Sequence, residues 1–213
     1  DLVRSRGLGD VYKRQAFIKT YLEMDIPQLG IRVPSSQLRK FWTMIAHSQG
    51  QLWNASRIAG SLGISAPTAR HYMDILEETF VVRQLQPYHI NVKKRLVKSP
   101  KVYLRDSGLL HSLLRLASMD DLQGHPAVGN SWEGFVIEQI LGSLPLSWRY
   151  YFFKTSAGAE IDLLLFDEKN RPSQTFEPMV ESSLNFEDPK GSCETMVLKL
   201  GGLIFNQRPC ILL

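Results

Sequence analysis

Three acidic residues in the second half of the sequence have the types and the placing that a magnesium site needs. Asp162 lies inside the apolar run Glu160-Ile-Asp-Leu-Leu-Leu-Phe, Glu177 lies in the next run, Thr-Phe-Glu-Pro-Met-Val, and Glu133 lies in a helical segment upstream. Carboxylates on adjacent strands come close enough to share a Mg²⁺ ion, which polarises a phosphodiester and activates a water molecule. The pattern predicts Glu133, Asp162 and Glu177 as a catalytic set, with Asp162 and Glu177 as the metal ligands.

The cation that hydrolysis also needs does not follow the second acid. A site of this kind usually has a cation two residues later, where this chain has Met179, an uncharged thioether. Lys154 and Lys169 would have to reach the site from other segments. Because each missing electrostatic group commonly lowers the rate by about 10²–10³-fold, we expect no useful rate of DNA cleavage. The alternative for the acids themselves is a solvated surface, since acidic residues are frequent in this half.

Three consecutive helical patterns followed by two strands predict a winged helix-turn-helix. The helices are PSSQLRKFWTMIAHSQGQ, NASRIAGSLGIS and SAPTARHYMDILEETF, with Ser35 or Ser36, Asn54 and Ser65 as their N-caps. Gly63 supplies the positive φ that the tight turn before the third helix needs. The strand patterns FVVRQLQPYHI and VKSPKVYLRD flank a basic turn, NVKKRL, which is the order of a wing.

The third helix and the wing carry the candidate DNA contacts. Polar side chains near the N-terminus of such a helix reach base edges in the major groove, and a basic wing contacts phosphates. The helix positions are Thr68, Arg70 and His71. The wing positions are Lys93, Lys94, Arg95 and Lys98. The alternative is a packing or protein-binding role, because Asp74, Glu77 and Glu78 make the later turns of the helix acidic.

The pattern divides the chain into three parts. Residues 1–15 are a non-native or linker-like segment, residues 16–125 a helical and winged-helix domain, and residues 126–213 a second, α/β domain. The second domain starts with the helix SWEGFVIEQILGSL, capped by Ser131 or Asn130, and continues with the strands WRYYFFKT, AEIDLLLF and TFEPMVES. It ends with a helical CETMVLKLGG and a strand, LIFNQR. The predicted fold class is α/β (α+β overall).

Charge divides the chain at nearly the same point. Residues 1–126 hold 18 Lys and Arg against 10 Asp and Glu, a net +8, whereas residues 127–213 hold 7 against 11, a net −4. This suggests that the first half meets a polyanion and the second holds a cation or a partner, the alternative being two solvated faces. No apolar run reaches the ~18 residues of a membrane span, so we expect a soluble, cytoplasmic protein without membrane contact. Cys193 and Cys210 form no C-x-x-C pair that would indicate zinc.

Five segments in order resemble the C-terminal half of predicted prokaryotic AAA-type ATPases. They are TYLEMDIPQLG, LWNASRIAGSLGISAPTARHYMDILEETFVVRQLQPY, KSPKVYLRDSGLLHSLL, GNSWEGFVIEQIL and GAEIDLLL. In that family a P-loop ATPase module precedes a winged helix and a domain of unknown function similar to PD-(D/E)xK nucleases. The resemblance implies a small restriction-endonuclease-like α/β domain. In such a domain Glu133 would be the helical acid, Asp162 the strand acid and Glu177 the glutamate of the E-x-K motif. This chain has Met179 at the position of the motif's lysine.

The resemblance also implies a partner, a nucleotide and a cofactor for this chain. An N-terminal ATPase module is the expected partner, and ATP binds only through that module, because this chain contains no G-x-x-x-x-G-K-[ST] motif. The implied function is a DNA-binding, nuclease-like region of an ATPase, with Mg²⁺ as the candidate cofactor. The alternative is a protein-interaction module that packs against its own ATPase domain or a partner protein.

Overall fold

The computed structural model describes residues 12–88, 97–155, 160–169, 172–176, 197–200 and 203–206. Over these ranges the fold is mixed α/β, with helices first, then a pair of strands, more helices and small antiparallel sheets. The predicted fold class is confirmed. The division into domains at residues 15 and 125 stays a prediction.

The first helical segment begins earlier than predicted. It covers residues 12–20 and continues as the π-helical turn η1 (Tyr21–Asp25) and the short helix α2 (Ile26–Gln28). The predicted helical and winged-helix domain starts at residue 16, and the helix extends a few residues before it because the stretch contains no glycine or proline. Its inward face joins the first hydrophobic core.

Helix α3 (Ser35–His47) has the predicted apolar stripe but a different start. Its stripe is buried in the first core and consists of Leu38, Phe41, Trp42 and Ile45. The prediction that Ser35 or Ser36 caps the helix is wrong: the N-cap is Pro34, whose carbonyl accepts the first helical hydrogen bonds. The extended backbone of Pro34 sets the start one residue earlier than a serine cap would.

Helices α4 (Ala55–Leu62) and α5 (Ala66–Glu78) form the predicted helix-turn-helix. The Asn54 side chain accepts from the backbone N–H of Arg57 over 3.0 Å, and the Ser65 hydroxyl accepts from that of Thr68 over 3.1 Å. Gly63 ends α4 in the left-handed region, with φ of 65°. These contacts confirm both caps and the turn glycine.

The wing strands β1 (Val82–Leu85) and β2 (Lys101–Leu104) pair antiparallel, as predicted. Their side chains alternate between two hydrophobic cores, because neighbouring residues on a strand point to opposite faces. Val82, Val102 and Leu104 lie in the first core. Leu85 and Tyr103 lie in the second. The wing strands are therefore an interior layer.

The next helices are α6 (Ser107–Leu113), α7 (Met119–Gln123) and α8 (Val128–Ser143). The prediction that Ser131 or Asn130 caps α8 is wrong, since the helix starts at Val128. Both side chains have distant partners instead: Ser131 Oγ lies 2.8 Å from His111 Nε2, and Asn130 Nδ2 donates to the Gln49 carbonyl over 2.8 Å. The two side chains therefore connect α8 to α6 and to the turn after α3.

The strands β3 (Arg149–Lys154), β4 (Glu160–Phe166) and β5 (Pro172–Phe176) form an antiparallel sheet in chain order. The first two strands are confirmed, whereas β5 starts earlier than the predicted strand TFEPMVES, whose residues from Glu177 on lie outside the described residues. The strands β6 (Val197–Leu200) and β7 (Leu203–Asn206) form a hairpin, so the helix predicted over CETMVLKLGG is wrong where it meets β6. Two short apolar runs separated by Gly-Gly are a hairpin signal, and here it outweighs the helical periodicity of the first run.

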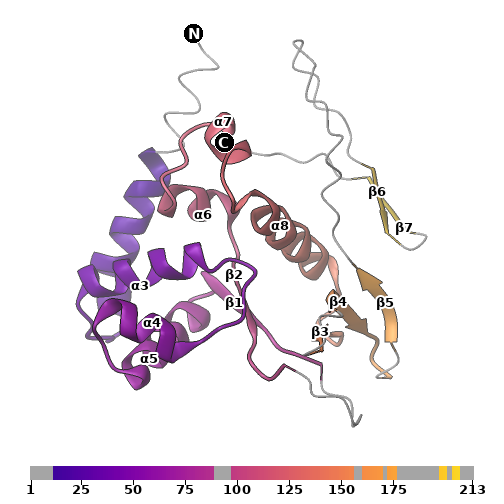
Figure 1. The fold of residues 1–213 in the computed structure, drawn as a ribbon, viewed down its shortest axis with the longest axis horizontal. Coiled ribbons are helices and arrows are strands. Elements are labelled where there is room, and N and C mark those ends of the chain that lie inside the picture. The colour runs from indigo at the N-terminus through magenta and orange to yellow at the C-terminus, as the bar shows by residue number, and fades with distance from the viewer. Residues whose placement is uncertain are drawn as a thin grey trace.

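The wing is hydrogen-bonded to the second part of the chain. Phe152 on β3 exchanges hydrogen bonds with the segment after β1: its N–H donates to the Gln86 carbonyl over 3.0 Å, and its carbonyl accepts from Tyr88 over 2.7 Å. The N–H of Val97, before β2, donates to the Lys154 carbonyl over 3.2 Å. In Figure 1, β1 and β2 accordingly lie between the helices α3 to α5 and the elements α8, β3 and β4.

Candidate functional site

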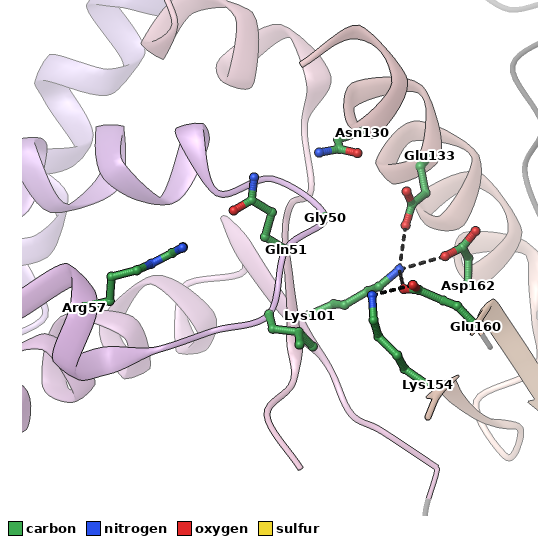
Figure 2. Close-up of a pocket in the computed structure, with 10 residues that line it drawn as sticks. Gly50, Gln51, Arg57, Lys101, Asn130, Glu133, Lys154, Glu160 and Asp162 are labelled. Atoms are coloured by element: carbon green, nitrogen blue, oxygen red, sulfur yellow. Dashed lines mark hydrogen bonds and ion pairs between the residues drawn. The ribbon is translucent and has the colours of Figure 1, made fainter. Parts of the chain in front are cut away.

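A lysine surrounded by three carboxylates lies where the first and second parts of the chain meet. Lys101 Nζ, at the start of β2, is 2.7 Å from Asp162 Oδ1, 2.8 Å from Glu160 Oε1 and 3.2 Å from Glu133 Oε1. The two strand acids come from β4 and Glu133 comes from α8. Figure 2 shows all three carboxylates directed at the Lys101 ammonium. We call Lys101, Glu133, Glu160 and Asp162 the lysine–carboxylate cluster.

A second layer of contacts fixes the carboxylates of the cluster. Lys154 Nζ donates to the second oxygen of Glu160, and the Tyr103 hydroxyl donates to Glu133 Oε1. The Phe152 ring lies 5.7 Å from Lys101 Nζ and adds a cation–π contact. The site thus contains two ammonium groups and three carboxylates, each with a defined partner.

Burial and charge together set the protonation of the cluster. Burial lowers the pKa of Lys101, but the attraction of Glu133 and the hydrogen bonds to Asp162 and Glu160 outweigh it, so this pKa lies above its usual value. Lys101, only 4% exposed, is therefore an ammonium at neutral pH.

The pKa values of the two glutamates shift in opposite directions. Burial raises the pKa of Glu133, and the charge of Lys101 only partly offsets this. Burial also acts to raise the pKa of Glu160, but hydrogen bonds from Lys101 and Lys154 lower it overall. Two features account for the difference: Glu133 is the more buried side chain, 15% exposed against 28% for Glu160, and Glu160 lies nearer to the Lys101 ammonium and has Lys154 as a second lysine.

A polar cleft of about 460 Å³ leads to the cluster. Its other walls come from the loop after α3, from the first turn of α4 and from the start of α8. The residues there are Gly50, Gln51, Leu52, Arg57 and Asn130. Figure 2 shows Arg57 on the far side of the cleft from the cluster. The carboxylates, which are between 15% and 28% exposed, can therefore be reached from solvent.

The structure brings together two of the three acids predicted as catalytic. Glu133 and Asp162 both contact Lys101, whereas Glu177 and Met179 lie outside the described residues. The predicted pairing of Asp162 with Glu177 around Mg²⁺ therefore stays a prediction. Among the described residues, there is no group of three or more His, Cys, Asp or Glu side chains suited to a metal ion.

Sequence reasoning missed Lys101 and Glu160. A signal existed for Glu160, because it is two residues before Asp162 on the same strand and so shares its face. A weaker one existed for Lys101, a single charge at the head of the apolar run Val102-Tyr103-Leu104. A charge buried beside such a run needs an opposite charge.

The predicted DNA contacts on α5 are in part exposed. Arg70 and His71 are exposed, whereas Ala69 between the predicted positions is buried, as expected. Thr68 is half-buried, and its hydroxyl lies 2.7 Å from that of Ser65. Of the wing positions, Lys98 is exposed and Lys93, Lys94 and Arg95 lie outside the described residues.

None of the helices in the described ranges has the length and apolar character needed to cross a bilayer.

Two protein-family models match the chain. Domain of unknown function DUF8612 matches residues 4–120, and Domain of unknown function DUF4143 matches residues 128–195. The first match contains the helix-turn-helix and both wing strands. The second contains α8 and the sheet of β3 to β5.

Curated relatives occur in mycobacteria. Uncharacterized protein Rv2008c of Mycobacterium tuberculosis and uncharacterized protein Mb2031c of Mycobacterium bovis are each 46% identical to this chain over 150 residues. The alignment covers 70% of this chain but 34% of each mycobacterial protein. The chain therefore spans about a third of the length of these relatives.

Two solved structures are similar at a low level. An S. aureus MepR mutant bound to an oligodeoxyribonucleotide is 18% identical, with 62% of this chain and 92% of that chain covered, and the transcriptional regulator PA3341 is 17% identical with the same coverage. Both superpose with a TM-score of 0.26, which is too low to establish a common fold.

Proposed function

The chain belongs to the DUF8612 family through the segment that holds the helix-turn-helix and the wing, and we propose that this segment binds duplex DNA. The observation that carries the proposal is the two-sided character of α5. One side is buried in the first core through Ala69, Met73 and Leu76, and the other presents Arg70 and His71 to solvent near the N-terminus of the helix. This is the part of a recognition helix that contacts base edges in the major groove.

The charge of the chain supports the same proposal. Residues 1–126 carry a net +8, and electrostatic contact with phosphates supplies most of the non-specific affinity of DNA-binding proteins. In the proposed complex Arg70 contacts a base, while Lys93, Lys94, Arg95 and Lys98 contact phosphates. The wing strands β1 and β2, which lead to these basic residues, have side chains buried in both cores, and the first core also contains the inward face of α5.

We further propose that the second part of the chain is nuclease-like but does not cut DNA. Glu133 and Asp162 both contact the Lys101 ammonium, so their carboxylates lie close together. A nuclease-like site needs such a group of neighbouring carboxylates. Met179 replaces the lysine that would stabilise charge on the phosphate. In the whole protein, we propose that an AAA-type ATPase module binds ATP and is the partner of this chain, in keeping with the larger size of the mycobacterial relatives.

A second candidate function is a protein-interaction module. The observation in its favour is apolar surface beside α5: Phe80, directly after the helix, is 73% exposed, and Phe17 is 44% exposed. Phe17 stacks on Tyr21, whose hydroxyl is hydrogen-bonded to Thr79, so both aromatic residues belong to one area. Such a surface could bind the ATPase module or another protein.

Salt-dependent binding to duplex DNA separates the two functions. We expect the chain to bind DNA at low salt and to bind much more weakly as salt rises, because bound phosphates release counterions. Arg70→Ala should weaken binding to a preferred sequence by about 5- to 150-fold, the range that corresponds to the removal of a single base-reading side chain. Lys169→Ala removes the same charge from the turn after β4 and is the matched control, with binding expected to stay within about twofold.

Absence of salt-dependent binding would favour the interaction module. In the same experiment, incubation with Mg²⁺ and linear or supercoiled DNA tests the second proposal. The parent chain should leave the DNA intact. Cleavage by the parent that disappears in Asp162→Ala would contradict it.

A further inference from the structure

We propose that the Lys101 ammonium is the resident cation of the acidic site and occupies the place at which a divalent ion would otherwise bind. This deepens the proposed function, because it gives the second part of the chain a reason not to cut DNA that is separate from Met179. The role given to the carboxylates rests on the proposed nuclease-like function. The contacts between Lys101 and these carboxylates do not depend on that function.

The coordination of the ammonium is complete. A lysine ammonium has three N–H donors and no acceptor. Three carboxylates, from Glu133, Glu160 and Asp162, lie within 3.2 Å of Nζ. Each donor therefore has one anionic acceptor, the arrangement in which a buried charge is compensated.

A magnesium ion does not fit the same place while Lys101 is there. Mg²⁺ takes oxygen ligands at about 2.0–2.1 Å in a nearly ideal octahedron. The oxygens that would have to turn toward it are those that accept from Lys101. Lys154, paired with Glu160, adds a second positive charge at the site. A divalent cation would meet two ammonium groups within a few ångströms of its ligands.

Lys101 cannot leave the site without disrupting the fold. All four residues of β2 are buried. Lys101 pairs with Leu85 on β1 and bridges to Leu52, while Tyr103 packs in the second core. The wing thus inserts a permanent cation among the carboxylates. Since the cleft still opens on the cluster, ions are excluded by charge and not by lack of access.

The first test removes the charge and keeps the length of the side chain. In Lys101→Met the carboxylates have no cation, so millimolar Mg²⁺ should raise the melting temperature. We expect about 5 °C relative to NaCl of equal ionic strength, the shift produced by a ligand at roughly 100 times its dissociation constant. The parent should not respond, and neither should Lys154→Met, the matched control, which removes a lysine but leaves Lys101 in place.

Two outcomes of this test would overturn the proposal. The first is a folded Lys101→Met that shows no Mg²⁺ response. The second is a parent that responds as strongly as the variant, which would instead support a metal site at Asp162 and Glu177 beside the lysine. If the response of Lys101→Met is real, adding Asp162→Asn should abolish it.

The second test uses the parent and does not depend on the folding of a variant. Amine-specific labelling followed by mass spectrometry should modify Lys101 at least about tenfold more slowly than the exposed Lys169, since its ammonium is protonated and buried. Mg²⁺ should leave the rate at Lys101 unchanged. A rate equal to that of Lys169, or one that Mg²⁺ raises, would mean that the lysine is displaced. Neither test involves DNA, so its failure is distinct from failure of the DNA-binding proposal.

Discussion

The guanidinium of Arg83 on β1 and the carboxylate of Glu138 on α8 form a two-point ion pair. Arg83 Nη2 donates to Glu138 Oε2 over 2.9 Å, and Nε donates to Oε1. Arg105 Nε also donates to Oε2, over 3.0 Å, and Arg83 Nη1 donates to the Tyr150 hydroxyl on β3 over 2.7 Å. One carboxylate therefore connects the wing, α8 and, through Arg83, the sheet of the second part.

Removing this carboxylate should destabilise the whole chain. Glu138→Ala leaves Arg83, whose side chain is only 14% exposed, without its counterion. Removal of one partner of a buried pair costs about 3–5 kcal/mol. Arg105, more than twice as exposed, adds little to this. We expect the free energy of unfolding, measured in urea, to fall by about 3 kcal/mol. The exposed Glu168→Ala is the control and should change it by less than about 0.5 kcal/mol. A decrease below about 1 kcal/mol for Glu138→Ala would mean that the pair is not effectively buried.

Acid should weaken the contribution of Glu160 to stability. Its pKa is lower in the folded chain than in the unfolded chain, because Lys101 and Lys154 outweigh the effect of burial. The ionised form therefore stabilises the fold at pH values above the unfolded pKa of about 4.3, and this stabilisation disappears as the pH falls through the lower, folded pKa. The difference in unfolding free energy between the parent and Glu160→Gln should be largest near pH 7 and shrink below pH ~4. A difference that grows on acidification would contradict the direction of this shift.

Two glycines with similar surroundings should respond oppositely to alanine. Gly63 and Gly60 both have open space where a Cβ would lie, but only Gly63 has a positive φ. Gly63→Ala should destabilise the chain by about 1–2 kcal/mol, because an L-residue is strained in the left-handed region. Gly60→Ala, inside α4, should stabilise it by about 0.5–1 kcal/mol. Thermal unfolding of both variants measures this, and equal effects would remove backbone strain as the reason for the glycine at the turn.

The basic wing tip should contribute affinity without sequence preference. Replacing Lys93, Lys94 and Arg95 together by alanine should weaken DNA binding about equally for all sequences. It should also reduce the slope of log affinity against log salt by about 0.9 for each phosphate that the variant no longer neutralises. Arg70→Ala should instead alter the preference among sequences. Titrations of two unrelated duplexes over a salt series measure both effects. A triple variant that binds like the parent would exclude the wing tip from the interface.

The helix-turn-helix could be predicted because its signals are local. Asn54 and Ser65 cap helices through residues three positions away, and Gly63 is chosen by its own backbone angle. Such signals can be read from a few neighbouring letters. The start of α8 could not, because Ser131 looks like a cap but has His111, twenty residues earlier, as its partner.

The lysine–carboxylate cluster was only half predictable for the same reason. The acids lie in recognisable strand and helix patterns, so Glu133 and Asp162 could be proposed. Lys101 is 32 residues from Glu133 and 61 from Asp162. Nothing in the periodicity of β2 indicates which distant strand lies beside it. That information resides in how the wing packs on α8 and β4, which is a property of the tertiary structure.

Because the wing packs between two cores, the two family segments are expected to evolve together. Tyr103 belongs to the segment matched by one family and Gly134 to the segment matched by the other, yet a Cβ on Gly134 would lie 3.2 Å from Tyr103 Cδ1. A larger side chain at either position would therefore collide with the residue at the other. The two segments should covary across related genomes at such positions, and recombination that exchanges one segment without the other should yield chains that fold poorly.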